Sequence, residues 1–249
     1  MFLTRSRLRT LTSLAVALAI VVSTIVLSKA MVRVFRIRHA DKTIVVTGSV
    51  RRRIVSDRIV WRASVVGHAT ELAPAYKTVA AGVPKALAFL HDRGIDAAQT
   101  KTSAVRITEI HPLDKDGHAI DAVIAAYSVE QDIEVESSDV AKVAAASRDA
   151  TQLIDAGIQI QSDPPKYLYT NLSQLKIDLL AGAAKDARLR ADQIAGNTGA
   201  TISQLNQAHM GVMQVNAAND STTSGDGIND TTSLEKDVSA VVTATFGID

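Results

Sequence analysis

The strongest periodic pattern of apolar and polar positions runs from Asn171 to Ala200, where apolar residues recur every three or four positions. This spacing predicts one long helix whose buried stripe comprises Leu172, Leu175, Leu179, Ala183, Ala187, Ala191 and Ile194. The stripe narrows from leucine to alanine, so the last three turns can lie close to the element they cover, most simply a β-sheet. Asn171 with Gln174 is predicted to cap the helix, and Gly196 or Gly199 to end it.

Charged residues occupy the outward positions of this predicted helix. Asp186 with Arg190, and Arg188 with Asp192, are spaced four apart, so each pair can form an ion pair along the helix surface. Such pairs contribute only a few tenths of a kcal/mol. They indicate a solvated face rather than a binding site.

Two further helices are predicted by the same spacing. The first begins with Thr70 as N-cap and ends at Gly94, and Pro84 inside its pattern predicts a kink or a break into two helices. Its expected buried stripe comprises Leu72, Tyr76, Val79, Val83, Leu87 and Leu90. The second begins near Ser137 or Ser138 and stops at Gly157. Its expected stripe comprises Val140, Val143, Ala144, Ser147, Thr151 and Ile154.

Alternating and β-branched runs between the helices predict strands. The predicted strands are 43–69 with a link at 50–57, then 100–109, 119–136, 158–161, 166–170, 201–215 and 238–246. A turn-rich connector, 111–118, joins two of them with Asp116 and Gly117 at its tip. Strict alternation over 129–136 predicts a strand with one face in water. Residues 216–232 are predicted to form a polar loop.

Three consecutive arginines, Arg51, Arg52 and Arg53, fall within the predicted link. They could form a patch for a polyanion, or they could lie in a solvated turn or along a strand edge that resists unwanted pairing. The second interpretation is favoured, so we do not expect a binding site here.

The N-terminal region carries nineteen uncharged, mostly aliphatic residues from Thr10 to Ser28. As a helix this run is about 28 Å long, close to the thickness of a bilayer core. An alternative is a cleaved signal peptide that ends at Ser28-Lys29-Ala30. The apolar run from Leu11 to Leu27 is longer than a usual signal core, which favours an uncleaved anchor. Basic residues flank both ends, so charge alone leaves its orientation open.

Charge is distributed unevenly along a chain whose formal net charge is +1. Residues 1–42 carry +7, since eight Lys or Arg oppose Asp41, whereas the remaining 19 basic and 25 acidic residues leave the body at −6. A basic segment beside an acidic body is typical of a membrane-flanking region and argues against nucleic-acid binding. The chain has no cysteine, which excludes disulfides, thiolate metal sites and a Cys nucleophile.

Candidate chemistry is sparse. His111, Asp114, Asp116 and His118 could gather a divalent cation, but a connector that uses Asp, Gly and Pro for turn geometry explains the same residues. The loop residues Asp220, Asp226, Asn229 and Asp230 have a calcium-like composition without the register of a calcium loop.

The remaining candidates are single residues. Trp61 is expected to pack in the core. The isolated histidines His39, His68, His91 and His209 are expected at the surface or as satisfied core residues. No hydrolase, phosphate-loop, dinucleotide or zinc-protease motif occurs. We therefore predict no catalytic, cofactor-binding or metal-binding residues and no enzyme activity.

Several motifs, in their order and spacing, carry a resemblance to a known family. They are Ile44 to Gly48 before an alternating strand, Gly94-Ile95 leading to 99–102, the strand from Tyr127 to Val135, the run from Ala184 to Ala195, and the closing strand from Val238 to Phe246. With them the chain resembles the SIMPL-domain family of bacterial envelope proteins over roughly 43–248. Ser56-Asp57 departs from the Pro-Asp of the family pattern.

The resemblance implies an α+β domain with helices packed on antiparallel sheet, exported across the inner membrane, self-associating, and linked to envelope or oxidative stress tolerance. It supplies no catalytic residues. We therefore expect an anchor region, 1–42, with one transmembrane helix at about 10–28, followed by a SIMPL-like domain, 43–249, with antiparallel sheets and three packed helices.

The expected protein is a single-pass inner-membrane protein whose soluble domain faces the periplasm and which acts without catalysis, as a homo-oligomer or by binding. Its partners are the membrane and other copies of itself, with no cofactor. A periplasmic module that binds a small ligand or metal is the alternative, and an unrecognised hydrolase is a third.

Overall fold

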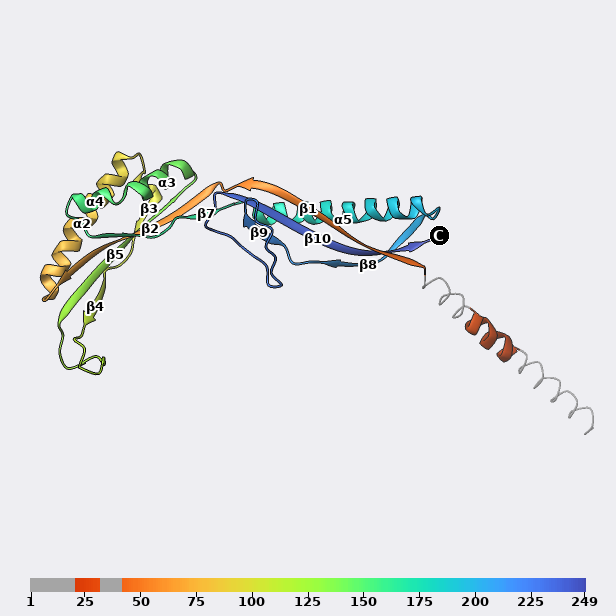
Figure 1. The fold of residues 1–249 in the computed structure, drawn as a ribbon, viewed down its shortest axis with the longest axis horizontal. Coiled ribbons are helices and arrows are strands. Elements are labelled where there is room, and N and C mark those ends of the chain that lie inside the picture. Colours follow the sequence, from red (N-terminus) through yellow and green to blue (C-terminus); the bar gives the residue numbers. More distant parts are fainter. Residues whose placement is uncertain (1–20, 32–41) are drawn as a thin grey trace, which may run out of the picture. The chain divides into compact units, whose positions relative to one another are not determined.

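The computed structural model describes residues 21–31 and 42–249 (Figure 1). These residues divide into two compact units. Unit 2 comprises Val50–Leu180 and Val212–Ala240, and unit 1 comprises Ala181–Gly211, Val241–Asp249 and the described residues up to Ser49. Each unit therefore combines segments that are far apart along the chain.

Unit 2 contains a six-stranded antiparallel sheet in the order β3-β5-β2-β6, with β4 beside β5 and β7 beside β2. Its strands are β2 (Arg58–Ala69), β3 (Thr100–Thr102), β4 (Arg106–Ile110), β5 (Ala126–Ser137), β6 (Ile160–Ser162) and β7 (Lys166–Leu168). Its helices are α2 (Leu72–Asp92), η1 (Ala97–Gln99), α3 (Val140–Asp149) and α4 (Gln152–Asp155). This order of strands and helices is the ferredoxin-like split β-α-β arrangement.

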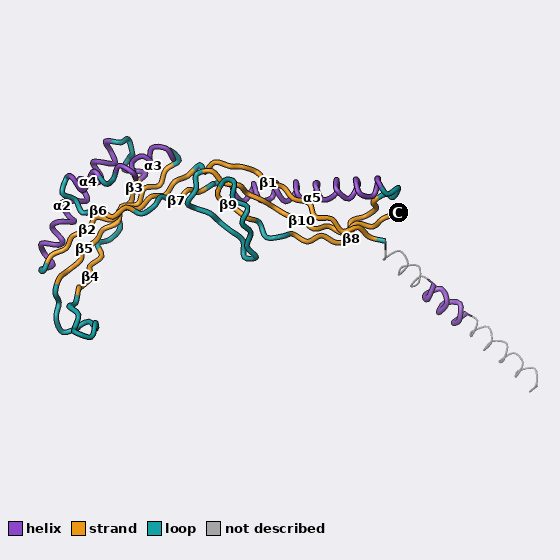
Figure 2. Tube along the Cα trace, in the orientation of Figure 1, coloured by secondary structure: helices purple, strands orange, loops and turns teal. Residues whose placement is uncertain are grey.

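Helices α2 and α3 cover one face of this sheet (Figure 2). Burial follows the alternation of the strands: on β2 the side chains of Ile59, Trp61, Ala63 and Val65 enter the core. Trp61 is buried and its indole Nε1 donates a hydrogen bond to Ser162 Oγ at 3.0 Å. The predicted core role of Trp61 is confirmed.

The second sheet has four strands in the order β1-β10-β8, with β9 also paired to β10. Its strands are β1 (Thr43–Val55), β8 (Ile202–Met210), β9 (Gln214–Ala217) and β10 (Glu235–Ile248). Strand β8 runs antiparallel to β10 with register shifts beside Phe246, at Thr245/Phe246 and Phe246/Ile248. Strand β1 has β10 as its only strand partner among the described residues.

Helix α5 (Leu172–Asn197) is the long helix that the sequence predicts. Its buried residues recur every four positions: Leu175, Leu179, Ala183, Ala187, Ala191 and Ala195. In unit 1, Ala187 and Ala191 form a buried cluster with Val46, Ala244 and Phe246. The predicted close packing of the alanine turns on a sheet is confirmed, although Ile194 is exposed and Ala195 takes its place.

Gly48 is the point of closest approach between β1 and α5. A Cβ atom on Gly48 would lie 2.2 Å from Ala183 O and 2.2 Å from Ala187 N, both backbone atoms. A glycine is therefore required on β1 where the helix backbone crosses it.

Strand β1 is continuous, so the predicted link at 50–57 is wrong. Arg51, Arg52 and Arg53 lie within β1 at the edge of its sheet, and the turn follows at 56–57. The run continues as strand because Arg53 has a partner across the sheet, Asp237 on β10, at 2.9 Å. The edge interpretation of the triple arginine is confirmed.

Helix α2 differs from the prediction at its start and at its proline. Its N-cap is Glu71 rather than Thr70, and Pro84 lies inside one continuous helix. Burial of Val79, Val83 and Leu90 on both sides of Pro84 holds this helix on the sheet despite the missing N–H. The buried face is also turned toward Ala75, Gly82 and Ala86, which leaves Leu72 and Tyr76 exposed.

The second predicted helix, from 137 or 138 to 157, is two helices, α3 and α4. Asp139 is its N-cap, because the Asp139 carboxylate accepts a hydrogen bond from Lys142 N at 3.1 Å. The interruption at Ala150 and Thr151 turns the second piece so that Leu153 is buried and Ile154 is exposed.

Several predicted strands are longer than the strands in the structure. The predicted strand 100–109 is β3 and β4, separated by residues 103–105, and the next strand begins at Ala126 rather than at Ala119. The predicted strand 201–215 is interrupted after Met210. The glycine endings at Gly94, Gly157 and Gly199 are confirmed by φ values of 72°, 76° and 75°.

The predicted anchor at about 10–28 lies largely outside the described residues. Residues 21–31 are helical, whereas residues 10–20 are not described. Within the described ranges, 21–31 and 42–249, no helix is both long and apolar enough to cross a membrane.

Candidate functional site

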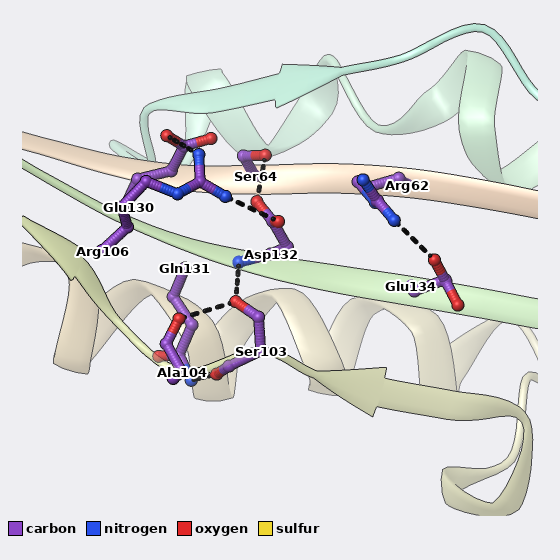
Figure 3. Close-up of polar contacts among 9 residues, drawn as sticks. All are labelled: Arg62, Ser64, Ser103, Ala104, Arg106, Glu130, Gln131, Asp132 and Glu134. Atoms are coloured by element: carbon purple, nitrogen blue, oxygen red, sulfur yellow. Dashed lines mark hydrogen bonds and ion pairs between the residues drawn. The ribbon is translucent and has the colours of Figure 1, made fainter.

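Ion pairs line the face of the six-stranded sheet opposite to the helices. On β5, Glu130, Asp132, Glu134 and Glu136 alternate with residues of the opposite face, which are buried except for the half-buried Gln131, as the sequence predicts. Arg62 Nη2 donates to Glu134 at 2.8 Å, and Arg106 donates to Glu130 at 3.0 Å and to Asp132 at 3.2 Å (Figure 3). Each carboxylate of this face therefore has a cationic partner from a neighbouring strand.

Ser103 fixes the junction between β3 and β4 against the middle of β5. Its hydroxyl accepts a hydrogen bond from Asp132 N at 3.0 Å, and its carbonyl accepts one from Gln131 Nε2 at 2.9 Å (Figure 3). The same Asp132 accepts a hydrogen bond from Ser64 Oγ at 2.7 Å. These contacts place the cation of Arg106 beside Glu130 and Asp132.

A cleft of about 520 Å³ in unit 2 is a candidate site. Its polar lining comprises Arg58, Glu136, Tyr167, Tyr169, Thr170, Asn229, Asp230, Thr231 and Lys236. Ile54, Leu168, Leu172 and Val215 supply its apolar wall. The volume is that of a small-molecule site, and aromatic and charged groups border the same space.

Arg58, at the first position of β2, links the charged sheet face to this cleft. Its Nη1 donates to Glu136 Oε1 at 3.1 Å, while its Nε is buried without a hydrogen-bond partner. The Arg58 side chain is 39% exposed, so its remaining Nη donors are open to water or to a bound anionic group.

Lys236 and Asp230 form a buried ion pair on another wall of the cleft. The Lys236 side chain is only 3% exposed, and its Nζ donates to Asp230 O at 2.7 Å and to Asp230 Oδ2 at 3.2 Å. Burial raises the pKa of Asp230, but hydrogen bonds from Thr232, Ser233 and Lys236 outweigh it and hold that pKa well below its ordinary value. The Asp230 carboxylate is therefore held as an anion beside the Lys236 ammonium group.

Asp57 ties the start of β2 to the segment before α5. Its carboxylate accepts hydrogen bonds from Thr170 N at 2.8 Å and Thr170 Oγ1 at 2.6 Å. Partial burial raises the pKa of Asp57, but these bonds outweigh it and lower the pKa below its ordinary value. The Asp57 carboxylate thus binds both the hydroxyl and the backbone N–H of Thr170, so its role is to hold this segment in place.

The residues of connector 111–118 that were candidates for a cation site instead form hydrogen bonds that stabilise its turn. Asp114 Oδ1 accepts hydrogen bonds from Asp116 N at 2.8 Å and His118 N at 2.9 Å, and Gly117 has φ of 85°. His111 Nδ1 lies 2.9 Å from Val123 O. Within the described residues no three or more His, Cys, Asp or Glu side chains gather as a metal-binding group.

The acidic loop residues likewise bond their own loop. Asp220 accepts hydrogen bonds from Thr222 N and Oγ1, and Asp230 accepts the equivalent pair from Thr232. Both are turns in which an aspartate bonds the residue two positions later. Asp226 and Asn229 lie in the same loop, and Asn229 lines the cleft.

The isolated histidines do not converge. His68 lies on β2, His91 on α2 and His209 on β8, and all three are exposed. His209 Nε2 lies 2.8 Å from Gln207 Nε2. His39 lies outside the described residues.

Sequence reasoning missed the cleft and the polar core beneath the loop. The side chain of Gln214 bonds the backbone of Val212, Ser224 and Ile228, and that of Asn216 bonds Asp220 and Thr222. The available signal was the placement of Gln214, Asn216, Lys236 and Asp237 in segments with strand patterning, where a polar residue can point inward.

The motifs that suggested a family now stand in a complete fold, and a family model matches residues 44–246. The chain belongs to the SIMPL family. The description of that family is "Protein of unknown function (DUF541)". This match covers most of the described chain, including both sheets and α5. No curated protein matches the chain.

Solved structures give weak matches to this SIMPL protein. A hydantoinase/carbamoylase family amidase from Burkholderia ambifaria is 16% identical, with 53% of this chain and 34% of that chain covered and a TM-score of 0.25. A second amidase of that family, from Burkholderia phymatum, is 16% identical, with 57% and 37% covered and a TM-score of 0.21. The de novo designed protein Foldit4 is 9% identical, with 43% and 93% covered and a TM-score of 0.23.

The chain spans only about a third of the length of the amidases that it matches. TM-scores at this level carry no inference about the activity of this SIMPL protein.

Proposed function

We propose that this SIMPL protein is anchored in the bacterial inner membrane, that its folded domain faces the periplasm, and that it acts without catalysis through self-assembly or binding. The anchor proposal rests on the uncharged run at 10–28 and the basic residues around it. A contribution to envelope or oxidative stress tolerance is the physiological role that goes with this address.

The observation that carries the non-catalytic proposal is how the charged groups of the candidate site are used. Glu136 pairs with Arg58, and Asp230 pairs with Lys236 and three further donors. In the described ranges, 21–31 and 42–249, neither His nor Cys lines the cleft. Both carboxylates therefore have cationic partners, and that of Asp230 is stabilised as an anion, which suits recognition better than proton transfer.

A topology fusion tests the address. Alkaline phosphatase and a fluorescent reporter are joined in turn after Asp249, and the membrane fraction is blotted for size. Phosphatase activity at full length is expected. Cytoplasmic fluorescence would instead mean that the dense basic flank at 33–38 had set the orientation, and the periplasmic proposal would be withdrawn.

Cross-linking and light scattering on the detergent-extracted chain test assembly. A defined species larger than one chain is expected at micromolar concentration. A strict monomer would remove self-assembly and leave binding as the mode of action.

The cleft favours a second candidate, a small-ligand module. Its ligand would carry an anionic group, because Arg58 has open donors, and an apolar part for Leu168 and Leu172. Thermal-shift measurements with millimolar succinate, benzoate and phosphate test this candidate. Arg58→Gln should abolish any shift, whereas Arg62→Gln, on the same face but outside the cleft, should keep it. Equal shifts in both variants would exclude the cleft as the site.

A further inference from the structure

A groove in unit 1 runs between the edge strand β1 and helix α5. It has a volume of about 530 Å³, and Val45, Val46 and Thr47 form one wall while Leu189, Gln193 and Ile194 form the other. Val45, Leu189 and Ile194 are 63%, 53% and 50% exposed. Three large aliphatic residues are thus exposed around one groove, although Ala187 and Ala191 on the same helix are completely buried.

The β1 wall also offers backbone hydrogen-bonding groups. Ser49 N donates to Asp186 Oδ2 of α5 at 2.8 Å, so this N–H points away from β10 and toward the helix side of the strand. Successive backbone groups of a strand point to opposite sides, so the N–H groups of Val45 and Thr47 share the direction of Ser49 N. Among the described residues, no strand pairs with this edge of β1.

Asp186 marks where the open edge stops. Its carboxylate bonds both Ser49 N and Arg190 Nε, each at 2.8 Å, and the pKa of Asp186 is lowered first by the Ser49 bond. Beyond this point β1 carries Arg51 and Arg52, which discourage pairing. The segment before it, 43–47, is uncharged and rich in β-branched residues, the composition of a strand that accepts another strand.

We propose that β1 and α5 form a peptide-binding groove in which an extended aliphatic segment adds as a further strand to residues 43–47. In strand addition, main-chain hydrogen bonds supply affinity, and pockets for alternate side chains supply specificity. Here Leu189 and Ile194 contact those alternate side chains. The inference rests on the proposed binding role and gives it a partner class.

The positive charge of Arg190 specifies one further feature of the peptide that the groove binds. Among the described residues that line the groove, Arg190 alone is charged. Its Nε is used by Asp186, while its side chain remains 54% exposed with further guanidinium donors available. The segment that fits is therefore extended and aliphatic, with one carboxylate where it passes Arg190.

The test uses the full-length chain in lipid nanodiscs and a fluorescein-labelled peptide of alternating threonine and valine ending in glutamate. Fluorescence anisotropy measures Kd, and residue-resolved hydrogen exchange follows the amides of β1. Binding should slow exchange at Val45 and Thr47. The same peptide with alternate amides N-methylated should not bind, because it cannot pair with the strand edge.

Exposed positions on α5 allow matched variants that keep the fold. Leu189→Lys and Ile194→Lys should each raise Kd about tenfold. Ile177→Lys, at an equally exposed aliphatic position of α5 outside the groove, should leave Kd unchanged. Arg190→Gln should remove the roughly two- to fivefold preference for a peptide ending in carboxylate over one ending in carboxamide.

Three results would overturn the inference. The first is that the peptide does not bind at millimolar concentration. The second is that it binds but leaves hydrogen exchange at Val45 and Thr47 unchanged. The third is that exchange at these amides slows when the protein concentration is raised without peptide. The last would assign the groove to a second copy of the chain. None depends on the topology fusion, so failure of the groove and failure of the periplasmic address are distinguishable.

Discussion

Gly48→Ala tests the contact between β1 and α5 directly. The added Cβ would meet Ala183 O and Ala187 N at 2.2 Å, and Ala187 Cα at 2.7 Å. These are backbone atoms of a helix and cannot rotate away. Ordinary contact begins near 3.4 Å, so α5 has to retreat from β1 by about 1.2 Å.

That retreat acts on a fully packed region. Ala183, Ala187 and Ala191 have no exposed surface, and Phe246 packs in the same cluster. A gap of about 1 Å forfeits a quarter to a half of the dispersion energy of each contact that opens. We therefore expect a loss at the upper end of the overpacking range, about 3 kcal/mol, or about 100-fold in the unfolding equilibrium of this unit.

Urea unfolding and hydrogen exchange of the α5 amides after Ala181 measure this loss. Gly196→Ala is the matched control, because Gly196 lies in the last turn of α5 and its added Cβ would meet no described atom within 4 Å beyond its chain neighbours and the local helix backbone. That change should stabilise the helix by about 0.5–1 kcal/mol. If Gly48→Ala unfolds at the wild-type midpoint, or if both variants shift alike, the close approach does not exist.

Three further predictions concern buried polar groups. Arg53, at 2.9 Å, lowers the pKa of Asp237 to about 2, so the stabilisation from this carboxylate is present above about pH 4 and lost as pH falls toward 2. It amounts to about 2 kcal/mol, and acid-unfolding curves of Asp237→Asn should lack that part of the pH dependence. Lys236→Ala should cost about 3–5 kcal/mol in urea unfolding because it leaves Asp230 buried without its cation, whereas a loss below 1 kcal/mol would contradict the ion pair. Trp61→Phe removes the bond to Ser162 and leaves a small cavity, so the thermal midpoint should drop by an amount equivalent to about 1–3 kcal/mol, and an unchanged midpoint would show that neither matters.

The α+β class and the long helix could be predicted from the sequence because periodicity reports directly on burial. The α5 pattern and the alternation of β5 both survive in the structure, and the glycine endings at Gly94, Gly157 and Gly199 follow from the left-handed backbone that glycine favours. The family followed from the same elements in the same order. These features are determined by residues that lie close together in the sequence.

The misassigned elements depend on partners that are distant in sequence. Arg51–Arg53 remain in a strand because β10 supplies Asp237 184 positions later. Pro84 remains in a helix because the sheet holds residues on both sides of it. The cleft has the same origin, since Arg58, Tyr167 and Lys236 come from three separate parts of the chain. Spacing along a sequence carries no information about such encounters.

The register shifts of β8 have a consequence for solubility. Strand β8 is the edge of its sheet and carries no Lys, Arg, Asp or Glu over 202–210, so charge does not protect it from templating aggregation. Its pairing with β10 slips at Thr245/Phe246 and again at Phe246/Ile248. A foreign strand in regular register would not match this irregular stretch, which disfavours templated aggregation there. Irregular pairing is thus expected to protect β8 as the arginines protect β1, and variants that regularise this register should aggregate more readily.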